Sequence, residues 1–397
     1  CCIFRYKMSE KMNKLNSYFE LTYDYSKGEV FTPDWQAQEI VEKIYELHPY
    51  VFISNSTTFC NPACSYGIFI IALVNKLMEC GHSEANAKSR VYGYDTRHKY
   101  INRLKRRGYR VYNKNILDGD LDMKFDVEVG NYPFSMMVGP DKKKDIWNEF
   151  PVSAINDRVK KGGILAPIHP SSWRNPDGGF TEVEKTLRSR QIQYLEMHNK
   201  EDGIKTFKSR TTYDWYVVKN ELNDGSSTIL KLQDGKEVNI NLSDFKFIPS
   251  GNIDKVKKQI AKENEDTVEV LHSWTSYETR NTHMNKEESE VFKYPCVNLV
   301  RVSGEPKLMW SSINSKGHFG IPKLIWGNGG YDMGSFLDEN GEYGLTQFSY
   351  GIVDTLENLK KIKKVFDSQD FRNMMKSCDG GNDNINGGDG SDTIVFF

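Results

Sequence analysis

The chain has 397 residues, of which 38% are hydrophobic and 27% are charged, and its formal net charge is −1 at pH 7. It is long enough to form about two domains, and its composition is that of an ordinary globular protein. The charge gives no overall preference for nucleic acid, no stretch is apolar enough to predict a membrane-spanning helix, and the N-terminus lacks a signal-peptide pattern.

The cysteines indicate a compartment. Seven cysteines are scattered along the chain, which is typical of reduced thiols, so we expect a cytoplasmic protein. Cys60 and Cys64 are four residues apart, but His82 completes no zinc-binding spacing. We therefore predict two buried thiols and no metal. The chain begins with Cys1 rather than Met, and Met8 is the expected start of translation.

The first predicted unit extends from residue 32 to residue 78. Thr32 before Pro33 is typical of a helix start, with a capping hydroxyl and a proline in the first turn. A strand, a turn of small residues and a helix then follow, and this order brings backbone amides against a ligand. The expected elements are a helix over Trp35–Leu47, strands over Val51–Ile53 and Thr58–Cys60, the turn Asn61–Gly67 and a helix over Ile68–Met78.

Strands and helices continue to alternate after residue 90, which predicts an α/β, doubly wound, Rossmann-like sheet. The second strand ends in Asp95, and an acid in that place typically hydrogen-bonds ribose hydroxyls. The expected elements are strands over Val91–Asp95, Tyr109–Tyr112, Phe125–Val129 and Ile164–Ile168, and helices over Lys99–Arg107 and about 145–160.

The strand Phe125–Val129 ends abruptly in residues 130–134, Gly-Asn-Tyr-Pro-Phe. An amide, a proline and an aromatic ring can together hold an amino group by its N–H bonds and stack on its ring system. Turn statistics alone favour an ordinary turn here. The strands and turns upstream favour a ligand site instead.

The second half of the chain has a different pattern. Residues 190–220 are expected to close the sheet, and residues 220–241 are polar and rich in turns. Residues 245–293 are charged and predicted to be helical, whereas residues 294–378 combine short strands with many glycines. Residues 380–394 resemble calcium-binding nonapeptide repeats, but fewer than two repeats cannot form a stacked core, so we favour a flexible acidic tail.

Taken in chain order, these pieces resemble the γ-type DNA adenine amino-methyltransferases of restriction–modification systems and phages, which are class I S-adenosylmethionine-dependent enzymes. That family has a Phe-Thr-Pro start, an Asn/Asp-Pro-Ala-Cys turn, an acid-ended second strand and an Asn-Pro-Pro-Tyr/Phe strand end. The matching segments here are Phe31–Pro33, Asn61–Gly67, Asp95, Asn131–Phe134, and later residues 168–174, 211–217 and 317–323.

The resemblance implies S-adenosyl-L-methionine as the cofactor, lying across the strand ends. The Phe-Thr-Pro segment would flank its methionine moiety, the Asn61 turn would let it approach the backbone, and Asp95 would bind the ribose. Asn115 and Ile116 would meet its adenine ring. The expected cofactor-binding residues are Phe31, Thr32, Pro33, Asn61, Pro62, Ala63, Gly67, Asp95, Asn115 and Ile116.

The resemblance also implies the chemistry. The amino group of adenine is a poor nucleophile because its lone pair is delocalised into the ring. The Asn131 side-chain oxygen and the Tyr132 main-chain carbonyl would accept both N–H bonds and favour a pyramidal nitrogen, without a metal. Phe134 would stack on a base flipped out of the duplex, at about 1–3 kcal/mol. The expected catalytic residues are Asn131, Tyr132, Pro133 and Phe134.

Four residues depart from the family pattern. Ser65 and Tyr66 replace Gly-Ser in the cofactor turn, where a side chain is expected to strain the backbone or crowd the cofactor. Tyr132 replaces the first proline of the strand end, which is expected to loosen the geometry. Asn115 stands where an Asp is common. These departures leave weak or lost activity open.

The resemblance implies that the chain has four parts. It also implies double-stranded DNA as the partner, with a cognate restriction endonuclease as a second candidate partner. No association with a membrane is expected. The parts are an N-terminal extension (1–29), a catalytic domain (30–220), a mixed α/β target-recognition domain that binds DNA (221–378) and a Gly/Asp/Asn-rich tail (379–397). The expected DNA-facing residues are Arg280, Arg301, Lys316, His318 and Lys323.

Two alternatives remain open. Similar strand ends serve methylation of other amines and amides, such as the side-chain amide of a protein glutamine, although the large second domain argues against that substrate. A catalytically degenerate DNA-binding or specificity module is the other alternative, and Ser65 and Tyr132 motivate it.

Overall fold

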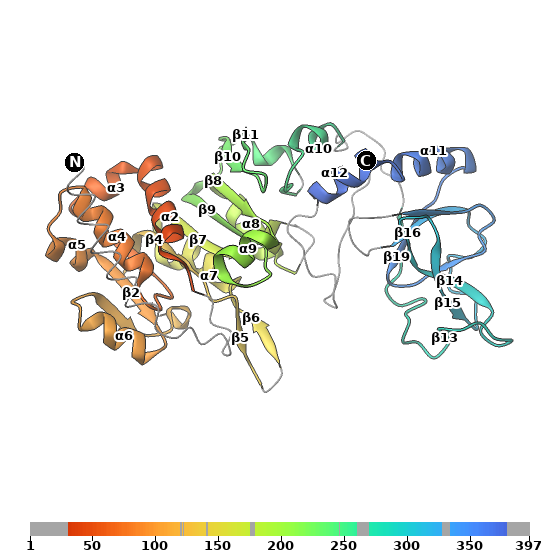
Figure 1. Ribbon diagram of the computed structural model, residues 1–397, viewed down its shortest axis with the longest axis horizontal. Helices are drawn as coiled ribbons and strands as arrows, with labels where there is room; N and C mark the ends of the chain where they lie inside the picture. Colours follow the sequence, from red (N-terminus) through yellow and green to blue (C-terminus); the bar gives the residue numbers. More distant parts are fainter. Residues whose placement is uncertain are drawn as a thin grey trace.

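The computed structural model describes residues 31–119, 121, 123–139, 142–174, 179–245, 247–259, 270–327 and 334–378. The expected N-terminal extension (1–29) and the acidic tail (379–397) lie outside these residues. Figure 1 shows a large sheet with helices on its faces, and a second group of short strands that lies beyond one end of the sheet.

The large sheet has nine strands in the order β11-β10-β8-β9-β7-β4-β1-β2-β3. β9 runs antiparallel to both of its neighbours, whereas the pairs from β3 to β7 are parallel. The strands are β1 (Phe59–Asn61), β2 (Val91–Asp95), β3 (Arg110–Asn113), β4 (Phe125–Asn131), β7 (Val159–Pro170), β8 (Arg190–His198), β9 (Tyr213–Leu222), β10 (Thr228–Lys231) and β11 (Glu237–Ile240). The chain changes direction across the sheet between β1 and β4, and ligands bind at such a switch point.

Helices cover both faces of this sheet because its strands are apolar on both sides. Along β7, Ile164, Ala166 and Ile168 pack into one hydrophobic cluster with α2 and α4, and Leu165 packs into the other with α7 and α8. The helices of this half are α2 (Asp34–Leu47), α3 (Pro49–Ile53), α4 (Ile68–Glu79), α5 (Glu84–Arg90), α6 (His98–Lys105), α7 (Glu149–Ser153), α8 (Thr181–Arg188) and α9 (Lys200–Phe207).

The doubly wound α/β sheet was predicted correctly, but three local predictions were wrong. Residues 51–53 belong to helix α3, because Pro49 starts a helical turn there. Helix α2 begins after Pro33 and has no side-chain cap, so Thr32 does not cap it. The helix expected over about 145–160 is limited to α7 and a following π turn, Ala154–Arg158.

The sheet also continues beyond residue 220, where the sequence placed the end of the catalytic domain. β10 pairs with β8, and β11 pairs with β10. In β10, buried Thr228 and Leu230 alternate with half-buried residues, and the edge strand β11 has no buried residue. An edge strand tolerates polar side chains, which explains the turn-rich appearance of the sequence. Between residues 245 and 293 the described residues contain one α-helix, α10 (Ile253–Gln259), so most of the expected helix there was wrong.

Short strands build the second half into two four-stranded sheets, β12-β19-β16-β17 and β13-β15-β14-β18. Helix α11 packs against the first sheet through Leu359 and Phe366, which contact Trp326 and its neighbours. The elements are β12 (Val270–Leu271), β13 (Met284–Asn285), β14 (Tyr294–Val300), β15 (Pro306–Ser311), β16 (Lys323–Gly327), β17 (Ser335–Asp338), β18 (Gly344–Leu345), β19 (Ser349–Ile352), α11 (Leu356–Phe366) and α12 (Gln369–Cys378).

Helix α12 connects the two halves (Figure 1). Met374 is buried in the cluster that underlies the nine-stranded sheet, beside α10. Phe371 and Met375 contact both that cluster and the cluster beneath α11. The two halves therefore share apolar side chains of one helix.

Candidate functional site

The end of β4 carries a buried acceptor without a donor. Asn131 is the last residue of the strand, and its Oδ1 atom is buried with no hydrogen-bond partner among the described residues. Gly130 precedes it at a point of close approach, because a Cβ there would lie 2.7 Å from Nδ2 of Asn61. Asn61 donates a hydrogen bond to the carbonyl of Val129 (2.7 Å) and so joins the two strand ends. A buried acceptor without a donor calls for an explanation, of which a ligand is one; Oδ1 of Asp214 and Nε1 of Trp215 are likewise without a partner among the described residues.

Tyr132 is anchored rather than loose. Its backbone N–H donates to the carbonyl of Ile168 (3.1 Å), and its hydroxyl donates to Oε1 of Glu128 (2.9 Å). The ring is 1% exposed and stacks on Phe150 with the centroids 4.8 Å apart. The expected loosening from loss of the proline is therefore opposed by two hydrogen bonds and a packed ring, and Pro133 follows a fixed residue.

A buried ion pair fixes the carboxylate that accepts the hydrogen bond of the Tyr132 hydroxyl. Arg158 grips Glu128 through two N–H···O bonds of 2.8 and 2.7 Å, and both side chains are almost completely buried. Burial alone lowers the pKa of Arg158, but the carboxylate of Glu128 outweighs this effect and the pKa is raised. Burial, with Glu128 adding to it, raises the pKa of Tyr132 well above its ordinary value, so the phenol remains a donor.

Aromatic side chains from other elements meet Phe134. Its ring lies edge-on to Phe207 of α9 with centroids 6.3 Å apart, and Phe207 packs in turn against Tyr213 of β9 at 4.7 Å. The ring of Tyr213 stacks on His198 at 4.2 Å. Sequence reasoning missed Phe207. Its signal is one large apolar residue in a polar stretch, close before the family-like segment 211–217.

The small-residue turn after β1 binds to the end of β2. The backbone N–H of Cys64 donates to the carbonyl of Tyr94 (2.8 Å), and that of Ser65 donates to Oδ2 of Asp95 (2.9 Å). Ser65 has φ 44°, the left-handed region that favours glycine, so the expected strain at this position is present. Gly67 starts α4 with φ 88°, and a Cβ there would lie 2.5 Å from Leu104.

Asp95 lies where the sequence predicted, but its carboxylate is engaged. Arg97 donates from Nε to Oδ1 (3.0 Å) and from a terminal nitrogen to Oδ2 (3.1 Å), and its backbone N–H also reaches Oδ1 (2.9 Å). Sequence reasoning missed Arg97. A ribose that binds Asp95 therefore has to displace this guanidinium, whose side chain is 37% exposed and also lies over the ring of Tyr100, 4.4 Å from its centroid.

The Phe31 segment and the turn meet through aromatic rings. Tyr66 of the turn contacts Phe31 with centroids 5.0 Å apart and Tyr100 at 4.5 Å. Thr32 and Pro33 are half-buried immediately before α2. The structure thus brings together two segments, 31–33 and 61–67, that the sequence assigned to one ligand.

The adenine-facing pair is the weakest part of the predicted site. Asn115 accepts from the N–H of Leu117 (3.2 Å) and donates to Asp118 (2.7 Å), so its amide holds its own turn. Ile116 is 2% exposed and packs in the core cluster beside Tyr94. Neither side chain is open to a ring without rearrangement.

Two of the five predicted DNA-facing residues are corrected by the structure. Lys323 is fully buried and pairs with Asp338 (2.6 Å), and His318 is 3% exposed and accepts from the N–H of Leu345 (3.2 Å). The glycines around them are typical of an exposed loop. In the structure, however, the two side chains are buried and stabilise a turn through their hydrogen bonds. Arg280, Arg301 and Lys316 are exposed, and they remain expectations.

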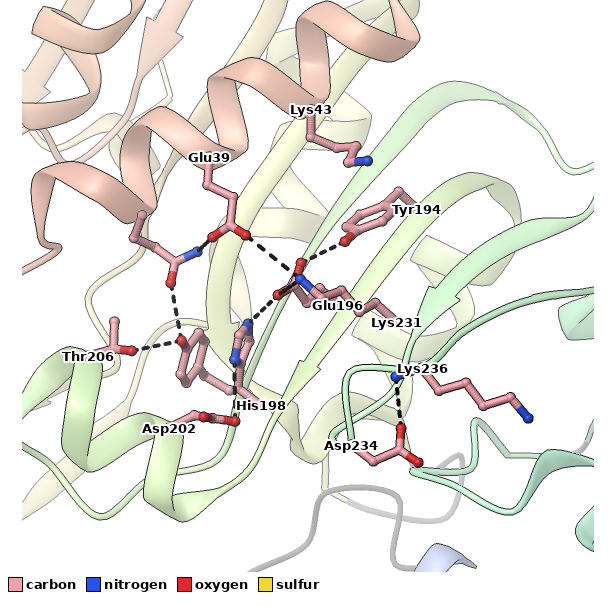
Figure 2. A network of polar contacts seen from close by, with 12 residues as sticks. Glu39, Lys43, Tyr194, Glu196, His198, Asp202, Thr206, Lys231, Asp234 and Lys236 are labelled. Atoms are coloured by element: carbon pink, nitrogen blue, oxygen red, sulfur yellow. Dashed lines mark hydrogen bonds and ion pairs between the residues drawn. The ribbon is translucent and has the colours of Figure 1, made fainter.

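A second polar network lies between α2, β8 and β10, and Figure 2 shows Glu196 near its centre. Glu196 accepts from the hydroxyl of Tyr194 (2.6 Å), pairs with Lys231 (2.9 Å) and lies 3.3 Å from Nε2 of His198. Burial alone raises its pKa, but these contacts outweigh burial and lower the pKa to about 2. Gln36 of α2 joins the network to the aromatic series by accepting from Tyr213 (3.2 Å).

Cys60 and Cys64 are buried free thiols, as predicted, and burial raises the pKa of both. Within the described ranges, no group of three or more His, Cys, Asp or Glu side chains is placed to hold a metal ion. In the same part of the chain, every helix is too short or too polar to cross a membrane.

No protein-family model and no curated protein matches the chain. Solved structures do match it. A nuclease-deletion mutant of the type ISP restriction–modification enzyme LlaGI, in complex with a DNA substrate mimic, matches with a TM-score of 0.56 and 10% identity over 94% of this chain and 54% of that chain. The fold is that of a class I methyltransferase.

Two further matches have lower scores. The type IIL restriction–modification enzyme MmeI in complex with DNA gives 0.44, with 10% identity over 83% of this chain and 61% of that chain. The methyltransferase subunit of a type I restriction–modification system from Streptococcus thermophilus gives 0.38, with 14% identity over 53% of this chain and 50% of that chain. The present chain thus spans about half to three-fifths of the length of these proteins.

The nine-stranded sheet places the turn of residues 61–67 between the ends of β2 and β4, where Asp95 and Asn131 lie. The left-handed Gly67 immediately before α4, the unpaired Oδ1 of Asn131 and the partly exposed Arg97 fit a polar ligand at this edge. The residues present are compatible with a nucleoside-containing cofactor once Arg97 releases Asp95.

Proposed function

We propose that this protein is a DNA methyltransferase that uses S-adenosylmethionine and modifies the exocyclic amino group of adenine in a flipped-out base. The fold and the matches to restriction–modification enzymes support the class of enzyme. The single observation that carries the adenine-specific chemistry is the buried and unpaired Oδ1 of Asn131, followed by Tyr132, Pro133 and Phe134.

The residues at the end of β4 would act on the amino group. Oδ1 of Asn131 would accept one N–H, and the carbonyl of Tyr132 would accept the other. Two fixed acceptors in a site that excludes water draw the nitrogen toward a pyramidal form with an available lone pair. Tyr132 contributes rigidity, because its hydroxyl and amide are both bonded. The two acceptors are therefore in position before the base binds, and the site does not have to reorganise during the reaction.

Aromatic rings would hold the base itself. Phe134 would stack on the adenine, and Phe207, which touches Phe134 edge-on, would form the adjoining wall. A base inside a duplex exposes its amino group only in the groove, so an enzyme that must align it with a donor has to extrude it. Stacking offsets part of the unstacking cost, at about 1–3 kcal/mol.

The cofactor supplies an electrophilic methyl group on a sulfonium. Asp95 would bind its ribose after Arg97 moves away, and the turn with Asn61, Pro62, Ala63 and Gly67 would admit its approach to the backbone. The Phe31–Pro33 segment would border its amino-acid end. Asn115 and Ile116 would contribute through their backbone or after a local shift, because their side chains are engaged.

Double-stranded DNA is the proposed partner, and residues 270–378 are proposed to read it. Arg280, Arg301 and Lys316 are the exposed cations of that half that we assign to phosphate contacts. Two of the structurally similar enzymes are described as complexes with DNA or a DNA mimic. A cognate restriction endonuclease remains a proposed partner of the same kind.

The test is incubation with tritiated S-adenosylmethionine and unmethylated genomic DNA, followed by nucleoside analysis. Label in N6-methyladenine is the expected result. Label in protein glutamine would assign the chain to the alternative amide chemistry. Asn131→Ala is the matched control, because it removes one acceptor and leaves the fold intact.

A second candidate function is a DNA-binding module without activity. The occupation of Asp95 by Arg97 and the left-handed Ser65 favour it, since both stand where the cofactor is expected. Equilibrium binding of radiolabelled S-adenosylmethionine separates the two candidates. The enzyme binds it, and Arg97→Ala should bind it more tightly, whereas the module binds DNA alone.

A further inference from the structure

A short two-stranded ribbon leaves the protein directly after the proposed catalytic residues. β5 (Ser135–Met137) begins one residue after Phe134 and pairs antiparallel with β6 (Lys143–Asp145). The N–H of Ile146 donates to the carbonyl of Phe134 (3.2 Å), which fixes the base of the ribbon to the end of β4. Figure 1 shows the ribbon projecting from the body of the sheet.

The ribbon exposes an apolar run that packing does not explain. Met136, Met137 and Val138 are 48%, 52% and 48% exposed, and they are consecutive. Three consecutive exposed apolar residues on an isolated two-stranded ribbon are unfavourable for solubility and contribute little to stability. Such a run marks a surface that another molecule covers.

The strand opposite the apolar run is basic. Lys144 lies across from Met136 and Lys143 lies across from Met137, while the carbonyl of Lys142 accepts from the N–H of Val138 (2.9 Å). Lys144 pairs with Glu149 (2.9 Å). Lys142 and Lys143 have no acidic partner among the described residues and are exposed. The covering molecule is therefore expected to carry negative charge and an apolar surface.

Duplex DNA has both properties, and its dimensions suit the ribbon. The major groove of B-DNA, about 12 Å wide, admits a two-stranded β-ribbon. Strand residues advance by about 3.3 Å each, so Met137 lies about 10 Å along the chain from Phe134. That length exceeds the depth of the major groove, about 8.5 Å, so the ribbon is long enough to reach the floor of the groove. Methionine is among the apolar side chains that minor-groove proteins insert between base steps, so its thioether side chain is able to fill an unstacked position.

We infer that the β5–β6 ribbon is a DNA-contacting element that enters the groove beside the extruded base. Successive strand side chains point to opposite faces, so one of Met136 and Met137 occupies the unstacked position and the other faces the groove wall, while Lys142 and Lys143 contact the flanking phosphates. This inference rests on the proposed function for the identity of the base. The contact between the ribbon and DNA does not depend on catalysis.

The first experiment measures DNA affinity against salt concentration, with sheared genomic DNA as the probe. The double variant Lys142→Gln/Lys143→Gln should lower the slope of log affinity on log salt by about 2, because each phosphate contact contributes about 0.9. Between 50 and 200 mM salt, the wild-type affinity should fall about tenfold more than that of the variant. An unchanged slope would overturn the inference whether or not the protein methylates DNA.

The second experiment uses the sequence that the wild-type protein modifies in genomic DNA, placed in a synthetic duplex. The double variant Met136→Ser/Met137→Ser should methylate the paired duplex at least about tenfold more slowly, because the unstacked position is left open. With an abasic site opposite the target adenine, extrusion is easy and the variant should be within about twofold of wild type.

The outcomes separate the two proposals. Equal loss on both duplexes, or no loss on either, would overturn the role of the methionines. Normal methylation and salt dependence in both variants would indicate that another protein segment or a second copy covers the ribbon. Absence of methylation by the wild-type protein would refute the proposed function, and the salt experiment would still decide whether the ribbon contacts DNA.

Discussion

Two strands of the same sheet have a buried polar oxygen near their ends, yet the two ends are built differently. At the end of β8, Glu196 is contacted by Tyr194, Lys231 and His198, so its carboxylate is well satisfied. At the end of β4, Oδ1 of Asn131 is equally hidden and has no partner among the described residues. Saturated polar groups stabilise a fold, whereas a buried acceptor without a donor calls for an explanation, and for Asn131 we propose a ligand.

The comparison extends to the neighbours of Asn131. Tyr132 and Glu128, within four residues of it, are bonded as completely as Glu196. The unpaired amide is therefore a local exception inside a well-satisfied region. The following variants test this contrast between saturated and unsatisfied polar groups.

The largest effect is expected from Arg158→Leu, which leaves Glu128 buried without its cation. Unfolding free energy should fall by about 3–5 kcal/mol, because an uncompensated charge remains in the core. Urea unfolding checks this. The double variant Glu128→Leu/Arg158→Leu should recover much of the loss, and wild-type stability in the single variant would show that the pair is not buried as described.

Asn131→Ala acts on the unsatisfied side. The methylation rate should fall about 10²–10³-fold, the size expected when one fixed acceptor is removed. Stability should hardly change, because the lost oxygen makes no hydrogen bond in the free protein. Initial rates with labelled cofactor and urea midpoints measure both quantities. Undiminished transfer, or a large loss of stability, would contradict the assignment.

Glu196→Gln should alter acid stability. The folded pKa of Glu196, about 2, is below its ordinary value of 4.5, so the carboxylate stabilises the fold above pH 4.5 and this contribution is lost as the pH falls toward 2. At neutral pH the variant should be less stable by at most about 3 kcal/mol. Urea midpoints at pH 7, 5 and 3 test this, with the exposed Glu237→Gln as a control that loses an equal charge.

If the urea midpoints of wild type and Glu196→Gln changed in parallel with pH, the contacts of Glu196 would not stabilise its ionised form, and the comparison would fail at the end of β8. Convergence of the two profiles between pH 4.5 and 2, with Glu237→Gln remaining parallel to wild type, would confirm it.

The smallest effect is expected at Ser65. Ser65→Gly should stabilise the fold by about 0.5–1 kcal/mol, since glycine adopts φ 44° without strain. Ser65→Ala retains the strain and removes the unpaired hydroxyl, so it separates the two causes. Thermal unfolding measures both variants. A destabilised glycine variant would mean that the serine side chain supports the turn.

The features predicted correctly from the sequence are those that follow from the spacing of apolar residues and from the order of the elements along the chain. The alternating apolar runs gave the doubly wound sheet, and the positions of Asn61, Asp95 and Asn131 at strand ends followed from it. Backbone strain at Ser65 was expected because a glycine is usual there, and its φ of 44° is consistent with that expectation. These features depend on local chain geometry, which a sequence displays directly.

Contacts between distant residues were not predictable in the same way. Arg97 neutralises Asp95, and Phe207 reaches Phe134 from a helix 73 residues later in the chain. Lys323 appeared to be a surface cation, but Asp338 and two backbone carbonyls enclose it. The outermost two strands on that side of the sheet, β10 and β11, were not recognised because their composition is polar. Each case depends on tertiary packing, which composition does not encode.

Helix α12 has a consequence for how the molecule denatures. Phe371 and Met375 contact the apolar clusters of both halves, and Met374 is buried in one of them. Unfolding of either half removes apolar neighbours of these side chains and therefore destabilises the other half. Calorimetry should therefore record a single cooperative heat-absorption peak, and Phe371→Ala should split it into two.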